Sequence, residues 1–185
     1  MTSRLIVDQL EGKSGSSNVI TVPTGHTLYS PGAVIQVVHQ TNSTARTNSS
    51  HSITNGVWQF TGTTATITPK FSTSKILIEY HQSFFFQTNT GTAGNANGHG
   101  TRIYRGNTAI TNRNGFADFY LDVGNASNNR HHGYGHGKHL DSPNTTSDVT
   151  YNIYGYFWTA DWTGLEYQYG GSESESTITL MEIGA

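Results

Sequence analysis

Four of the nine histidines fall within ten residues, in the stretch from Arg130 to Leu140 that reads RHHGYGHGKHL. Imidazole is a common ligand of transition metals, and histidines repeated around a three-fold axis could hold one ion together. The cluster contains no Asp or Glu. Histidines that serve as neutral hydrogen-bonding groups at a surface or an interface are therefore the interpretation that we favour over a metal site. The candidate metal ligands are His131, His132, His136 and His139.

The same stretch predicts a strand with two unlike faces, because successive side chains of a strand point to opposite sides. One face would carry the larger side chains, namely Tyr134, His136, Lys138 and Leu140. The other face would be left bare by glycines at positions 133, 135 and 137, so that another backbone or an aromatic ring could approach closely. Clustered histidines would also gain charge near pH 6.5, which predicts that mild acid loosens any interface they line.

Aromatic residues offer a second kind of chemistry, because flat apolar rings stack on sugars while neighbouring Asn, Asp and Thr bond the hydroxyls. Trp58 and Trp158 fall within predicted strands, where we expect them to be core or subunit-interface residues. Trp162 follows Asp161 in a predicted turn. Asp161 and Trp162 are therefore the candidate glycan-binding pair.

The sequence carries no specific catalytic motif. EGKSG at Glu11–Gly15 resembles a phosphate-binding loop, but the earlier glycine that such a loop requires would fall at Val7. There is no G-x-S-x-G elbow and no H-E-x-x-H pair. Carboxylates that could be paired as in glycosidases mostly flank turns or strand ends; they are Asp118, Asp122, Asp141, Asp161 and Glu166. We expect a protein that is not an enzyme and needs no cofactor.

Composition narrows the possible partners. Charged residues make up 12% of the 185 residues and the net charge is −2, with the basic residues scattered along the chain, so binding to nucleic acid is disfavoured. The absence of cysteine excludes disulfides and thiolate zinc sites. The N-terminal apolar run is too short for a signal peptide, and no segment approaches a spanning helix. We therefore expect no membrane association and synthesis in a cytoplasm.

Short strand-like runs, separated by clusters of Gly, Asn, Pro or Ser, dominate the chain, and helix signals are almost absent. Ten such runs predict an all-β fold, a β-sandwich of the jelly-roll type. Long connections at Thr41–Asn55, Thr88–Gly98 and Gly124–Arg130 would be its exposed loops. The predicted strands are Ala33–Gln40, Gly56–Phe60, Thr64–Thr68, Lys75–Phe86, Thr101–Arg105, Phe116–Val123, Gly133–Leu140, Val149–Trp158, Leu165–Tyr169 and Thr177–Ile183.

The N-terminal segment differs from the rest, because a short apolar run is followed by the Gly- and Ser-rich stretch Glu11–Asn18. One interpretation is an extended arm that buries its apolar residues against a partner, as a strand added to a sheet edge would. The other is a first strand of the same domain. We expect an arm over residues 1–25 and the sandwich over residues 26–185. The docking residues of the arm would be Leu5, Ile6, Val7 and Leu10.

Four segments of the chain carry strand and turn motifs: the LDSP–TTS–TYN pattern at Leu140–Asn152, STITLMEIGA at Ser176–Ala185, ITPKFSTSKILIEY at Ile67–Tyr80, and VDQLEGKSGSSNVITVPTGHTL at Val7–Leu28. These segments resemble fibre-like proteins of marine and freshwater cyanobacterial tailed phages. The match from Gln82 to Arg130 is loose. These are strand and turn signatures, so the resemblance implies the kind of particle component rather than its position on the particle.

The resemblance and the composition together predict a virion protein that is assembled in the host cytoplasm. We expect it to form a homo-oligomer, a trimer, and to contact other virion proteins. A short fibre or fibre tip anchored by the arm is the first interpretation. A capsid or tail decoration protein is the second. A carbohydrate-binding module that recognises a host cell-surface glycan is the third.

Overall fold

The computed structural model of this chain describes residues 24, 30–47, 54–88, 95–111, 116–123, 130–158, 162–169 and 174–185. At residues 88, 95–96, 116–123 and 162–163 the description covers the backbone alone. The chain divides between Ser30 and Pro31 into two units, and all the described strands lie in the second unit, Pro31–Ala185. Apart from Thr24, the predicted arm lies outside the described residues, and so do its four docking residues, Leu5, Ile6, Val7 and Leu10.

Strands are the only regular elements of the described residues. Their bounds are β1 (Val34–Asn42), β2 (Arg46–Thr47), β3 (Gln59–Ile67), β4 (Lys75–Thr88), β5 (Asn95–Arg105), β6 (Thr108–Ala109), β7 (Phe116–Val123), β8 (Arg130–Asp141), β9 (Val149–Trp158), β10 (Trp162–Tyr167) and β11 (Ser176–Ile183). Within this described part of the chain, no helix is long and apolar enough to cross a membrane.

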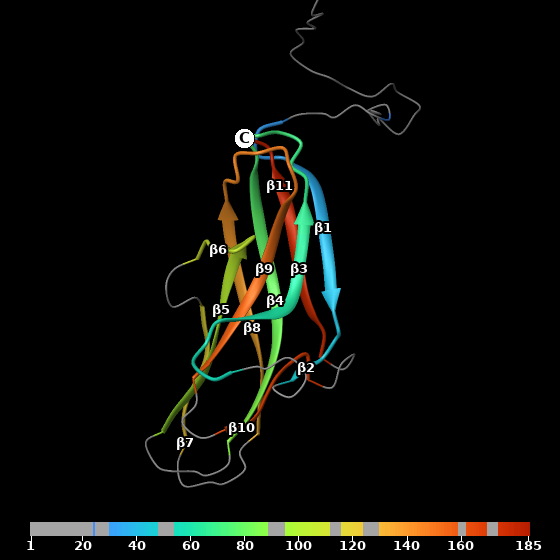
Figure 1. Cartoon of the computed structure of the whole chain (residues 1–185). Helices are drawn as coiled ribbons and strands as arrows, with labels where there is room; N and C mark the ends of the chain where they lie inside the picture. The colour runs from blue at the N-terminus through green and yellow to red at the C-terminus, as the bar shows by residue number, and fades with distance from the viewer. Residues whose placement is uncertain are drawn as a thin grey trace, which may run out of the picture. The chain divides into compact units, whose positions relative to one another are not determined.

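Eight of these strands form two antiparallel sheets that pack face to face. The first sheet has the order β1-β11-β4-β8 and the second has the order β3-β9-β5-β7, with β2 and β10 extending the first and β6 the second. Counted along the chain, the eight strands follow the orders 1-8-3-6 and 2-7-4-5, which is the interleaving of a jelly roll. In Figure 1, β3 and β9 belong to one layer and β11 and β4 to the other. The predicted all-β jelly-roll sandwich is confirmed.

The long strand β4 organises the first sheet. One of its edges pairs with β8 from Ile76 to Gln87. Its other edge pairs first with β11, from Lys75 to His81, and then with β10, from Phe84 to Thr88. Strands β11 and β10 therefore follow one another along the same edge of β4, as Figure 1 shows.

One strand replaces two predicted ones. The runs Gly56–Phe60 and Thr64–Thr68 were expected to be separate, but β3 continues from Gln59 to Ile67 with a bulge between its pairings to β9. The bulge centres on Gly62, whose φ of +94° favours glycine. A Cβ there would lie 2.7 Å from Nδ2 of Asn42, so the site also lacks room for a side chain.

Several strand bounds were also predicted wrongly. Strand β5 begins at Asn95 instead of Thr101, β10 runs from Trp162 to Tyr167 instead of Leu165 to Tyr169, and the two-residue strands β2 and β6 were not predicted. The start of β5 is rich in Asn and Gly, which have low strand propensity, yet β7 and β9 pair with its two edges. Pairing on both sides therefore overrides the local preference.

The core between the sheets has an aliphatic part and an aromatic part. A polar layer adjoins both: Gln82 accepts a hydrogen bond from Thr61 at 2.7 Å and donates one to Ser176 at 3.0 Å. The aliphatic part consists of Ala65, Ile67, Ile76, Ile78, Tyr80, Ile103, Val149, Tyr151, Ile153, Ile178 and Leu180. The aromatic part consists of Phe84, Phe86, Phe157, Leu165 and Tyr167, with the buried His99 stacked on Phe84 at 4.0 Å.

A partly buried ion pair ties the two sheets together. Asp141, at the end of β8, accepts hydrogen bonds from Nη1 of Arg105 at 3.0 Å and from the Tyr151 hydroxyl at 2.7 Å. Burial and the Asp141 carboxylate raise the pKa of Tyr151 well above its ordinary value, so this hydroxyl remains a proton donor. The end of β8 is thereby bonded to β5 and β9 of the opposite sheet.

Candidate functional site

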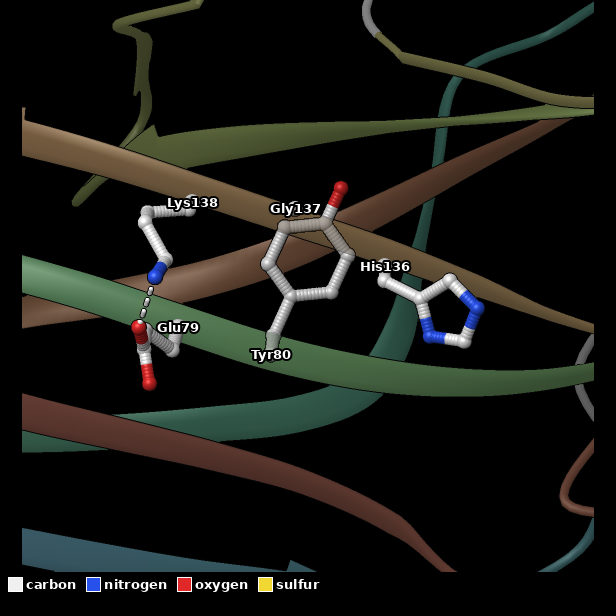
Figure 2. A pocket seen from close by; sticks show the side chains of 5 residues that line it. All are labelled: Glu79, Tyr80, His136, Gly137 and Lys138. Atoms are coloured by element: carbon white, nitrogen blue, oxygen red, sulfur yellow. Dashed lines mark ion pairs between the residues drawn. The ribbon is translucent and has the colours of Figure 1, made fainter.

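The two faces of β8 differ as the sequence predicted. The side chains of Tyr134, His136, Lys138 and Leu140 are exposed on the outer face of the first sheet. On the inner face, the Phe84 ring lies where a Cβ of Gly133 would be, at 2.5 Å from Cζ, and the Tyr80 ring lies against Gly137 in the same way. Figure 2 shows the Tyr80 ring against the β8 backbone at Gly137. The glycines therefore make room for two core rings.

The four candidate histidines do not converge within one chain. His132 and His136 lie on the outer face of β8, whereas His131 and His139 lie on the face of the glycines. His132 packs against Phe85, with ring centroids 4.8 Å apart, and His131 packs against Phe86 at the same separation. Among the described residues, no three His, Asp or Glu side chains are grouped so that they could hold a metal ion. Aromatic packing accounts for two of the four candidates.

A histidine pair that the sequence analysis did not single out joins β4 to β8. His81 lies opposite His136, with ring centroids 5.1 Å apart, and the Tyr134 ring meets His81 edge-on at 4.4 Å. Burial and then the nearby His136 lower the pKa of His81, while burial and then His132 lower the pKa of His131. These imidazoles remain neutral more readily than exposed ones.

The predicted glycan-binding pair is only partly visible. Asp161 lies outside the described residues. Trp162 was expected in a turn, but it is the first residue of β10 and pairs with Thr88 of β4. The turn prediction is therefore wrong at Trp162, because β10 begins earlier than its apolar alternation indicates.

An apolar row crosses the outer face of the first sheet. Val37 lies opposite Met181, Met181 opposite Leu77, and Leu77 opposite Leu140, so one residue from each of four adjacent strands joins the row. Val37 is 56% exposed and Leu140 is 49% exposed, and Val34, on the same strand as Val37, is 52% exposed. We call Val37, Met181, Leu77 and Leu140 the apolar row.

Polar pairs border the apolar row on one side. His39 is hydrogen-bonded to Thr179 at 2.9 Å, and Lys138 forms an ion pair with Glu79 at 2.5 Å, as Figure 2 shows. A shallow hollow lies over the Glu79–Lys138 pair and is also lined by His136. The outer face of the first sheet thus combines an uncovered apolar row with a polar margin, which is typical of an interaction surface.

The outer face of the second sheet carries aromatic rings. Alternation along β9 points Tyr154, Tyr156 and Trp158 outward, because Ile153 and Phe157 point into the core. Trp58 and Trp158 are half-buried on this face and not in the core, which corrects the core alternative of the sequence analysis. We call this surface the aromatic face; it consists of Trp58, Phe60, Tyr104, Tyr154, Tyr156 and Trp158.

Neighbouring rings of the aromatic face contact one another. Tyr104 stacks on Tyr154 with centroids 4.0 Å apart, and Tyr156 contacts Trp58 at 5.2 Å and Trp158 at 5.9 Å. Arg102 of β5 reaches across β9 to Trp58, and its Cζ lies 4.1 Å from the centre of a Trp58 ring. The period-two spacing of β9 was the sequence signal for this face. The positions of Trp58 and Arg102 on it could not be found without the register between the strands.

The fold and these surfaces define the class of protein: a jelly-roll β-sandwich with side-chain clusters on both outer faces. No protein-family model matches the chain, and no curated protein matches it. A chain from the structure of infectious bursal disease virus, Gx strain, has weak structural similarity, with a TM-score of 0.32 and 13% sequence identity. The match covers 90% of this chain and 42% of the viral chain, so this chain spans less than half of its length.

Proposed function

We propose that this protein is a structural component of a tailed-phage virion, without enzymatic activity, that assembles as a homotrimer. In this proposal it is a short fibre or fibre tip, held to other virion proteins by its N-terminal arm. The resemblance of four segments to cyanobacterial phage fibre-like proteins supports the virion role. The jelly-roll sandwich is compatible with it, because such a fold is a rigid support on which loops can be displayed.

The apolar row is the observation that supports a homo-oligomer. Fully burying one Val or Leu side chain contributes about 1.5–3 kcal/mol, so leaving Val37 and Leu140 about half exposed forgoes part of that stabilisation. A second copy that covers the row would recover it. Most soluble oligomers are symmetric homo-oligomers, so we take the covering partner to be further copies of this chain.

Two alternatives differ in where the protein lies. A capsid or tail decoration protein would use the same apolar row against the shell or tail. A carbohydrate-binding module would present the aromatic face or its loops to a host glycan. Gold-labelled antibodies viewed on purified virions would separate them, since label on tail ends supports the fibre and label over the head supports decoration.

Light scattering on the purified chain tests the oligomer directly. We expect a trimeric mass for the wild type and a monomeric mass for Val37→Glu, because a carboxylate in the apolar row would be buried without a partner. Val57→Glu is the matched control, since Val57 is 49% exposed but precedes β3 of the second sheet. A monomeric wild type, or loss of the oligomer in both variants, would contradict the proposal.

A further inference from the structure

Arg102 is a buried cation whose hydrogen bonds are incomplete. Its side chain is on the outer face of the second sheet, yet the residue is only 9% exposed. Neither Nε nor Nη2 has a hydrogen-bond partner among the described residues, and both are closed off from solvent. Buried donors without acceptors cost free energy, so a charged group in this state needs an explanation.

The two unpaired nitrogens define the shape of a group that they could bind. Nε and Nη2 lie on the same edge of the planar guanidinium, and this edge donates two parallel hydrogen bonds to one carboxylate. Trp58 lies against the guanidinium in a cation–π contact, with Cζ 4.1 Å from its ring centre. The arginine is therefore positioned for a planar, singly charged acid.

The surroundings of Arg102 favour a sugar that carries this acid. Tyr154 lies directly opposite Arg102 in the sheet, and Tyr156 and Trp158 continue the same outward-facing side of β9. Opposite Tyr156 and Trp158, β5 has Gly100 and Gly98, so these rings have no side chain beside them on that strand. These rings are half-buried, and partly exposed aromatic rings next to polar donors are the usual composition of a sugar-binding surface.

Other anionic or apolar partners fit less well. A nucleic acid presents a row of phosphates and requires several cations, whereas Arg102 is the one cation among the described outward-facing positions of β9 and β5. Two copies that met through this face would bring two arginines together. The described outward residues of β9, from Thr150 to Trp158, include no carboxylate that could pair with them.

We propose that the aromatic face binds a carboxylated sugar, such as a uronic acid unit of a polysaccharide, with its carboxylate on Nε and Nη2 of Arg102. Because Nε and Nη2 are closed off from solvent, binding requires a neighbouring side chain to shift, and in this proposal it is Trp58, which precedes β3 and contacts Arg102 and Tyr156. The sugar ring then stacks on Tyr156 or Trp158. This site lies within one chain, so it is independent of the virion role and of the apolar row.

The test measures binding to the full chain by calorimetry and by tryptophan fluorescence. The probes are oligogalacturonate, oligomannuronate and hyaluronan fragments, each compared with its methyl ester, in which the ring is kept and the charge is lost. We expect at least one free acid to bind and its ester to bind about tenfold more weakly or worse. Equal binding of acid and ester, or no binding of any of the three acids, would overturn the proposal.

Variants assign the binding to Arg102. Arg102→Lys keeps the charge but loses the two-donor edge, so affinity for the acid should fall about tenfold. Arg130→Lys is the control, because Arg130 is exposed on β8 of the other sheet. The comparison of acid with ester uses the wild-type protein alone. It therefore still tests whether the carboxylate is recognised if Arg102→Lys does not fold. The site would be overturned if Arg102→Lys bound the acid as well as the wild type does. It would also be overturned if the protein bound dextran sulfate but none of the acids, or if Arg102 proved to be needed for self-association.

Discussion

Gly133 and Gly137 are the residues of β8 whose identity the core requires most directly. Each faces a ring of β4, and a Cβ at either position would overlap that ring. Since the backbone at both positions is an ordinary strand, the requirement comes from space and not from φ. The run of alternating glycines is thus a packing feature of the interior face.

Gly133→Ala should destabilise the fold. The added methyl would lie 2.5 Å from Cζ of Phe84, and such overpacking costs about 1–3 kcal/mol. Thermal unfolding followed by circular dichroism should show a Tm several degrees below the wild type. Gly164→Ala is the control, because its Cβ would meet Phe85 at 3.4 Å, an ordinary contact. Equal Tm values for the two variants would refute this account of β8.

His81 should titrate below the ordinary histidine value of 6.5, because burial and His136 both disfavour its charged form. A histidine whose pKa is lower in the folded state contributes stability above pH 6.5, and this stability is lost as the pH falls through the folded pKa. NMR titration of the ring protons measures the pKa of His81 in the folded protein. His136→Gln should raise the pKa of His81 while burial keeps it below 6.5; a wild-type value at or above 6.5 would disprove the prediction.

At the scale of elements, one carboxylate connects three segments of the sandwich. Glu182 of β11 accepts hydrogen bonds from Gln36 of β1 at 2.6 Å and from the backbone N–H of Lys70 at 2.7 Å, before β4. Burial alone would raise the pKa of Glu182, but its hydrogen bonds outweigh burial and lower the pKa below the ordinary value. The carboxylate therefore anchors the β3–β4 connection to the first sheet.

Glu182→Gln should lower the free energy of unfolding and make it depend less on pH in the acid range. A lowered folded pKa means that Glu182 stabilises the fold above its ordinary pKa of 4.5, and that this stability is lost as the pH falls through the folded pKa. At pH 7 the variant should lose about 1–3 kcal/mol, since the amide cannot accept all the same bonds. Urea unfolding at pH 7 and pH 3 measures both effects. A parallel loss of stability with acid in the two proteins would contradict this role.

At the scale of the whole molecule, every strand among the described residues lies between Val34 and Ile183. A chain that lacks Met1–Asn18 should therefore keep its sandwich, with a far-UV spectrum and Tm close to those of the full chain. Loss of incorporation into virions by this folded variant would support a docking arm. Unfolding of the truncated chain would show that the segment is part of the core.

Much of the architecture was predictable from the sequence, because it depends on local patterns. Period-two alternation in Val149–Trp158 identified β9 and its two faces, and the glycines of β8 indicated a close approach of rings. The bulge that joins two predicted runs into β3, and the start of β5 at Asn95, were missed. Both depend on pairing with distant strands, which overrides local propensity.

The chain's own pattern of apolar residues, turns and glycines determined an all-β sandwich and which side chains of a strand share a face. The tertiary structure alone decided which strands lie next to each other and in what register. That register places Val37 in line with Leu140, His81 opposite His136, and Trp58 over Arg102. These residues are far apart in the chain, and the packing of the whole sandwich sets their alignment, so no local pattern records it.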